Sequence, residues 1–193
     1  VILYEFAGCM HLADDLELVT EVRPAITASF VAAGDDIKRR ELDWASEVAS
    51  TLLELVGKGA TVGIERINVG AVRSLSEYGF LLVDAQQPIE RARAIKSSEE
   101  ISCVRASLRA TEIPVARLRH NLRPGLTENA LWSILHQAVI AQNGDYVETR
   151  LLSSGQRTNP WFQESGTRVI GENELVALDT DVVGCYGYYA DFS

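Results

Sequence analysis

The sequence predicts an α/β (α+β) protein built from two parts. Residues 1–90 alternate short apolar strands with helical patterns, whereas residues 91–193 carry two long helices followed by strand patterns and a hairpin. Of the 193 residues 47% are hydrophobic, which is enough apolar surface to offset the entropy lost on folding. We therefore expect two small folded domains rather than a disordered chain.

The first part has the strand and helix rhythm of an α/β unit. Apolar residues recur at helical spacing over residues 41–55, and glycines follow as stop signals, so this segment is predicted to be an amphipathic helix. Strand, helix and strand patterns come next, over residues 61–65, around 71–78 and over 80–83. The run Gln86-Gln87-Pro88 is interpreted as the boundary of this unit.

A long helix is predicted to open the second part. Ser97 and Glu100 have the spacing of a capping box, in which each residue satisfies a backbone donor of the other. Pro114 is expected to kink this helix because proline removes a backbone donor and clashes with the preceding turn. The helix is expected to end at residues 123–125.

A second helix and three strands are predicted to complete the chain. Thr127 is expected to cap the helix, with a stop at residues 143–144. Strand patterns then cover residues 147–152, 175–183 and 188–193, and the last two of these read as a hairpin.

Three aspartates mark the predicted hairpin. Asp179 and Asp181 share one face of the first strand because strand side chains alternate. If residues 184–188 form a five-residue loop, Asp181 lies opposite Asp191. Like charges this close destabilise a fold unless a cation lies between them, so the pattern favours a site for calcium or for a catalytic divalent metal. The other interpretation is that this face is a solvated polar exterior.

Charge and cysteine content limit the partners of the protein. The net charge of −9 argues against a nucleic acid or an anionic membrane as partner, because both require clustered Lys and Arg. No window reaches the apolar length of a membrane span. Three widely spaced cysteines predict neither a disulfide framework nor a thiolate zinc site, which suits a cytoplasmic protein.

The segment from about Arg93 onward resembles the first half of a pita-bread domain of the creatinase, aminopeptidase P and prolidase superfamily. The resemblance implies that residues 1–90 are part of a creatinase-type N-terminal domain and that residues 91–193 are the N-terminal half of a catalytic domain. The motifs that carry it are Ala92-Arg93-Ala94-Ile95-Lys96-Ser97, Arg123-Pro124-Gly125-Leu126-Thr127-Glu128 and Tyr188-Tyr189-Ala190-Asp191-Phe192-Ser193.

The pattern Asp179-Thr180-Asp181, together with the run from Arg150 to Glu164, is similar to the dimethylsulfoniopropionate lyases built on this fold. By this resemblance Asp179, Asp181 and Asp191 would bind one or two divalent transition-metal ions, of iron, manganese, cobalt or zinc. The resemblance also implies that the remaining metal ligands and the catalytic base lie downstream of Ser193, and that the protein is a homodimer.

Peptidases of the superfamily generally carry a proton-shuttling His shortly after the glycine turn, where this sequence has Trp161 and Phe162. Aromatic rings suit a sulfonium or another onium group through cation–π contact, so both are candidate substrate-binding residues. Packing in a core or an interface is the other interpretation of these two side chains.

The sequence thus predicts a metal-dependent lyase that cleaves dimethylsulfoniopropionate to dimethyl sulfide and acrylate. The alternatives are an Xaa-Pro aminopeptidase or dipeptidase, and a binding protein without catalysis, so the substrate is a small molecule or a dipeptide. Because the chain starts at Val1 in an apolar run and stops at Ser193 in a predicted strand, we expect a fragment that is inactive by itself.

Overall fold

The computed structural model describes all residues from 1 to 193, and the chain divides into two compact units, Val1–Ala94 and Ile95–Ser193. The predicted division after residue 90 falls inside helix α4, Gln86–Ala94. The residues Gln86-Gln87-Pro88, predicted to mark the boundary, form the first turn of α4. Proline is tolerated there, since the first N–H groups of a helix have no intrahelical acceptor.

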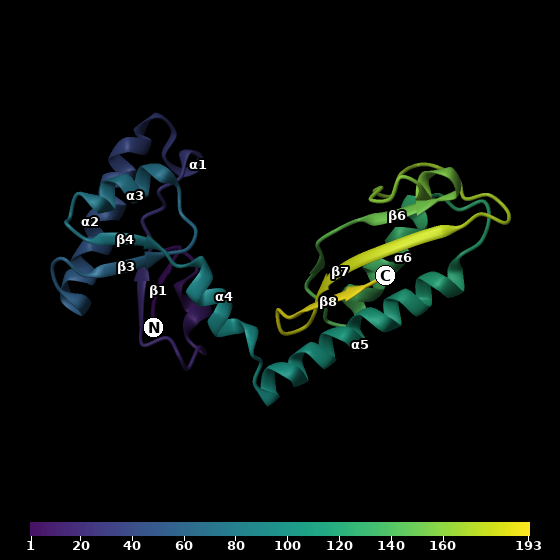
Figure 1. Ribbon diagram of the computed structural model, residues 1–193, viewed down its shortest axis with the longest axis horizontal. Helices are drawn as coiled ribbons and strands as arrows, with labels where there is room; N and C mark the ends of the chain where they lie inside the picture. The colour runs from purple at the N-terminus through teal and green to yellow at the C-terminus, as the bar shows by residue number, and fades with distance from the viewer. The chain divides into compact units, whose positions relative to one another are not determined.

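The first unit contains two separate pairs of parallel strands, β1 with β2 and β3 with β4. Helix α3 connects β3 to β4, as the strand, helix and strand pattern predicts (Figure 1). A small core forms where Ala45 and Ala49 of α2 meet Leu75 of α3 and Phe80. The elements are β1 Ile2–Glu5, η1 Met10–Ala13, β2 Glu21–Pro24, α1 Phe30–Ala33, η2 Gly34–Asp36, α2 Ile37–Val56, β3 Thr61–Ile64, α3 Val69–Ser76 and β4 Leu81–Asp84.

The second unit is an antiparallel sheet packed against two helices. Strand β7 is central, with β8 along one edge and the short strands β5 and β6 along the other. Its elements are α5 Ser98–Asn121, α6 Glu128–Ala141, β5 Tyr146–Val147, β6 Leu151–Ser154, η3 Gly155–Thr158, β7 Val176–Val183 and β8 Tyr189–Phe192. No helix of the chain is long and apolar enough to cross a membrane.

The helix starts follow the predicted capping residues. Ser97 Oγ accepts a hydrogen bond from Glu100 N at 3.2 Å, and Ser97 N donates to Glu100 Oε2 at 2.7 Å, so the capping box is confirmed. Thr127 Oγ1 accepts from Ala130 N at 3.1 Å at the start of α6. Helix α5 continues through the buried Pro114 to Asn121.

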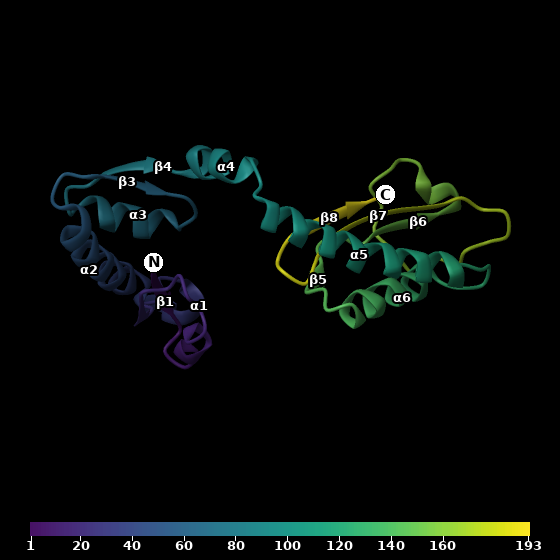
Figure 2. The ribbon, with the colours of Figure 1, turned by 90° about the horizontal axis from the view of Figure 1, so that it is seen from below.

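Both helices of this unit lie along one face of the sheet, as Figure 2 shows. Leu131, Leu135 and Val139 of α6 are fully buried and form a core with Leu152 of β6 and Val182 of β7. Side chains alternate along β7, so the residues next to Val182 point to the opposite face of the sheet. That opposite face is the one without helices.

The single strand predicted over residues 147–152 is wrong, because it is divided into β5 and β6. Val147 pairs with Val182, whereas Leu151 pairs with Asp179. Leu151 is thus four residues from Val147, but their partners on β7 are only three residues apart. The extra residue between them is a β-bulge, which bends the strand and reverses which face its later side chains occupy. Leu151 therefore lies on the face opposite to that of Val147, although the two residues are four apart.

Candidate functional site

The three predicted metal ligands lie on the sheet face without helices. In the β7–β8 hairpin Asp181 pairs directly with Asp191, which confirms the predicted opposition. Asp179 lies two residues from Asp181 on the same face and pairs with Leu151 of β6. Asp179 and Asp181 are half-buried, and Asp191 is exposed.

The electrostatics of this face are those of carboxylates held close together. Burial, and then the negative charges of Asp191 and Asp181, raise the pKa of the Asp179 carboxyl above its ordinary value. A divalent cation would relieve this repulsion, and carboxylate oxygens are the donors that hard cations prefer. The three side chains therefore fit part of a metal's ligand shell.

The chain by itself does not complete such a shell. No group of three or more His, Cys, Asp or Glu side chains is arranged to hold a metal ion. The assignment of the three aspartates as ligands consequently stays a prediction, and further donors are required to enclose a cation.

The bulge between β5 and β6 brings a hydroxyl to this face. Thr149 Oγ1 donates a hydrogen bond to Asp181 Oδ2 at 2.9 Å, and Glu148 N donates to the main-chain oxygen of Asp181 at 2.9 Å. A donor on a candidate ligand's second oxygen fixes which oxygen remains free for a metal. Bulges are common beside active sites because they redirect a side chain in this way.

Two tyrosines continue the same face beyond the aspartates. Tyr189 is two residues before Asp191 on β8, and its hydroxyl lies 3.4 Å from that of Tyr146 on β5. The hydrogen bond with Tyr146, and then the charge of Glu148, raise the pKa of Tyr189 to about 12. The Tyr189 phenol is therefore protonated near neutral pH.

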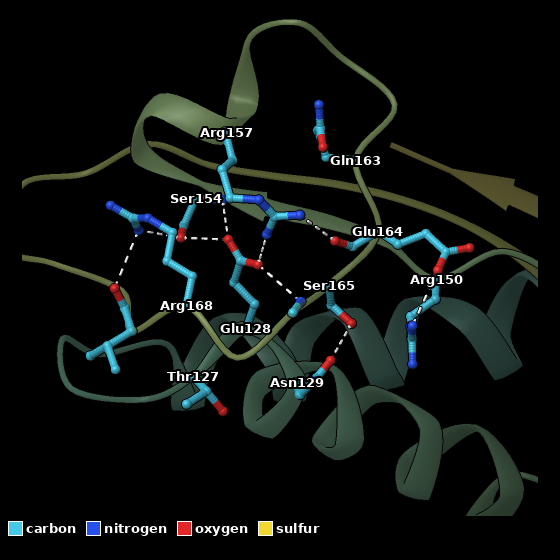
Figure 3. Close-up of polar contacts among 12 residues, drawn as sticks. Thr127, Glu128, Asn129, Arg150, Ser154, Arg157, Gln163, Glu164, Ser165 and Arg168 are labelled. Carbon is cyan, nitrogen blue, oxygen red and sulfur yellow. Dashed lines mark hydrogen bonds and ion pairs between the residues drawn. The ribbon is translucent and has the colours of Figure 1, made fainter.

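A second polar cluster surrounds Glu128 at the start of α6. Glu128 Oε1 accepts from the N–H and the hydroxyl of Ser154, both at 2.8 Å. Glu128 Oε2 accepts from Gly166 N at 3.0 Å and from Arg157 Nη1. Figure 3 shows the Glu128 carboxylate reaching up from the helix between Ser154, Arg157 and the segment that follows the η3 turn.

A second ion pair borders this cluster. Arg168 Nη1 donates to Ser154 Oγ at 2.7 Å, and Arg168 Nη2 donates to Glu174 Oε1 at 2.5 Å. The Arg168 guanidinium, with help from Gly171 N, lowers the pKa of Glu174 to about 2. This pair thus connects the start of the η3 turn to the loop before β7.

The predicted substrate-binding residues Trp161 and Phe162 lie in the segment between η3 and Glu164. Their exposed fractions are 44% and 70%, so both rings are available to a ligand. The hydrophobic core of this unit contains neither of them. Their role in substrate binding remains a prediction.

From the sequence alone, Glu128 is one residue of the motif that starts the second predicted helix, and an acidic residue in a first helical turn is explained by the helix dipole. The role of Glu128 as a common acceptor depends on three donors, Ser154, Arg157 and Gly166. These residues are far from residue 128 in the sequence, and no local periodicity connects them to it. Thr149 and the tyrosine pair were also missed, because their placement depends on the bulge and on cross-strand register.

The comparisons with known proteins agree with this architecture. Residues 102–193 match metallopeptidase family M24. Over the whole chain the sequence is 32% identical to a protein of Roseovarius nubinhibens named dimethylsulfoniopropionate lyase DddP, and equally identical to the protein of that name from Roseobacter denitrificans. The chain covers 44% of the length of each of these two relatives.

Solved structures show the same fold. The X-Pro aminopeptidase from Thermotoga maritima MSB8 aligns with 98% of this chain at a TM-score of 0.77 and 17% identity, over 49% of its own length. The prolidase from Pyrococcus furiosus aligns with 98% of this chain at a TM-score of 0.75 and 16% identity, over 53% of its length.

The fold is therefore that of the pita-bread enzymes, in the part that this chain covers. The predicted resemblance to the creatinase, aminopeptidase P and prolidase superfamily is confirmed, since residues 102–193 match metallopeptidase family M24 and the whole chain is similar to the two relatives above.

Proposed function

We propose that the complete protein carrying this chain is a metal-dependent lyase that cleaves dimethylsulfoniopropionate to dimethyl sulfide and acrylate. The observation that carries the proposal is the placement of Asp179, Asp181 and Asp191 on the sheet face without helices, with Asp181 opposite Asp191. The identity of 32% with proteins named as such lyases supports this reaction over others of the fold.

The reaction removes a proton and a sulfide from neighbouring carbons. A base takes the proton from the carbon next to the carboxylate, and the electron pair of that C–H bond becomes the C=C bond of acrylate. The C–S bond breaks with its electrons on sulfur, so dimethyl sulfide leaves as a neutral molecule. We expect the base to lie outside residues 1–193, as the resemblance implies.

An iron, manganese, cobalt or zinc ion held by the three aspartates would act as a Lewis acid on the substrate carboxylate. The aspartates would supply negative charge on one side of such an ion and leave its other side to further ligands and to substrate. The hydrogen bond from Thr149 would hold Asp181 in the orientation that this requires.

Trp161 and Phe162 would receive the other end of the substrate. The sulfonium group is a cation without N–H or O–H donors, so it is held better by aromatic faces than by hydrogen-bond acceptors.

An Xaa-Pro metallopeptidase is the second candidate, and the match of residues 102–193 to a metallopeptidase family favours it. Peptide hydrolysis needs a group that passes a proton to the leaving amine. Trp161 and Phe162 occupy the position where the resemblance predicts a His for that task. Binding without catalysis is the third outcome of the experiment below.

The test measures metal content and product together in the complete protein. We expect bound divalent metal and release of dimethyl sulfide into the headspace after addition of dimethylsulfoniopropionate. Asp181→Ala should lose both, whereas the exposed Glu172→Gln should lose neither. Metal with hydrolysis of an Xaa-Pro dipeptide and no sulfide would establish the peptidase instead. Neither metal nor turnover would leave the binding protein.

A further inference from the structure

The Glu128 carboxylate has no exposed surface, yet every acceptor position it offers is used. An ionised carboxylate accepts about four hydrogen bonds, two at each oxygen. Glu128 has four donors: the N–H and hydroxyl of Ser154 on Oε1, and Arg157 Nη1 and Gly166 N on Oε2. The arrangement is therefore built for a charged carboxylate and not for a neutral side chain.

These donors come from the two ends of one segment. The segment is 155–165. Ser154 ends strand β6 directly before it, Arg157 lies in the η3 turn at its start, and Gly166 directly follows it. Arg157 Nη2 also donates to the main-chain oxygen of Glu164 at 2.7 Å, which joins the two ends a second time. Figure 3 shows Arg157 lying between the Glu128 carboxylate and Glu164.

Asn129, the residue after Glu128 in α6, also holds the end of this segment. Asn129 N donates to the main-chain oxygen of Gly166 at 3.0 Å, and Ser165 Oγ donates to Asn129 Oδ1 at 2.8 Å. The segment 155–165 is thus fixed at its base, while its exposed part carries Trp161 and Phe162.

We infer that Glu128 is a positioning residue, whose buried carboxylate closes the segment 155–165 and so sets where Trp161 and Phe162 meet the onium group of the substrate. This inference rests on the proposed function. Glu128 itself touches no substrate. Its removal leaves Ser154, Arg157 and Gly166 without their common acceptor, which loosens both ends of the segment although the hydrogen bonds to Asn129 remain.

The informative change is Glu128→Gln, because it keeps the shape of the side chain. Its amide oxygen can still accept from Ser154, but its NH₂ group then meets Arg157 and Gly166 N, which are also donors. The matched control is Glu164→Gln in the same segment. Its side chain pairs with Arg150 at 3.1 Å across an exposed surface, and such pairs contribute little.

We expect Glu128→Gln in the complete protein to raise KM for dimethylsulfoniopropionate about tenfold and to change kcat by less than about threefold. Glu164→Gln should change neither. The emission of Trp161, isolated by subtracting the spectrum of Trp161→Phe in each background, should become more accessible to acrylamide in Glu128→Gln. A purely structural role would lower the folded fraction and kcat together, with KM unchanged, and that result would overturn the inference.

Two features keep the experiment decisive. If Glu128→Gln does not fold, Arg157→Gln tests the same closure from a residue whose side chain is 33% exposed, and Arg157→Lys should restore part of the wild-type KM. If the wild-type protein releases no sulfide, the proposed function fails. The acrylamide measurement then still decides about the segment, because unchanged quenching of Trp161 in Glu128→Gln would reject the positioning role.

Discussion

A single hydroxyl decides how one candidate metal ligand presents its oxygens. Thr149 Oγ1 donates to Asp181 Oδ2 at 2.9 Å, and this donor exists only because the bulge between β5 and β6 brings residue 149 to the aspartate face. Hydrogen bonds of this kind orient metal ligands, and their loss typically weakens metal binding about 10- to 100-fold.

We therefore predict that Thr149→Val weakens the affinity of the complete protein for its divalent metal by about tenfold, because Asp181 loses its fixed orientation. Valine has the same branched shape but no donor. Competition with a chromophoric chelator measures the affinity. Thr149→Ser keeps the hydroxyl and serves as the control, so equal affinities in the valine, serine and wild-type proteins would contradict the role of this hydrogen bond.

The candidate site residues differ in how far their placement can be predicted from the sequence. The alternation rule and a five-residue loop suffice to predict that Asp181 lies opposite Asp191, and the register confirms it. Glu128 could not be recognised in this way, because an acidic residue in a first helical turn usually faces solvent. Its burial depends on donors 26 to 38 positions away, which periodicity does not connect to it.

At the scale of elements, the hairpin that carries the aspartates is held by close contact with α5. Gly184 follows β7 and is buried, and a Cβ placed on it would lie 2.6 Å from the Cα of Ser107 and closer still to its Cβ. The helix backbone thus approaches the chain at a distance that only glycine permits. This contact fixes the end of β7 against the helix layer.

We predict that Gly184→Ala lowers the free energy of unfolding by about 1–3 kcal/mol, because helix and hairpin must separate to admit the methyl group. Urea unfolding followed by tryptophan emission measures the change. Gly8→Ala is the control, because a Cβ at that position meets nothing within 4 Å. A Gly184→Ala protein as stable as this control would show that β7 and α5 are not held together at this point.

Helices were more predictable than strands for a physical reason. A helix satisfies its own backbone, so caps such as Ser97 and Thr127 and an apolar stripe locate it from local sequence alone. The strands depend on partners. The bulge that separates β5 from β6 is a property of pairing with β7, and nothing in residues 147–152 alone indicates the extra residue.

At the scale of the whole molecule, the two units have separate cores, and the aspartates belong to the second unit. The chain spans 44% of the length of the lyases that it matches. The proposal that the three aspartates bind a metal therefore requires further ligands, because these residues alone form no complete group of ligands.

We accordingly predict that Mn²⁺ stabilises the complete protein much more than it stabilises residues 1–193. A ligand present at about 100 times its Kd stabilises the folded state by about 2.7 kcal/mol, whereas binding far weaker than the metal concentration adds almost nothing. Thermal unfolding with and without Mn²⁺ measures the difference, and Asp191→Asn in the complete protein should abolish most of the shift. An equal shift in residues 1–193 would mean that these residues hold the metal by themselves, and the proposal that further ligands lie elsewhere would then be wrong.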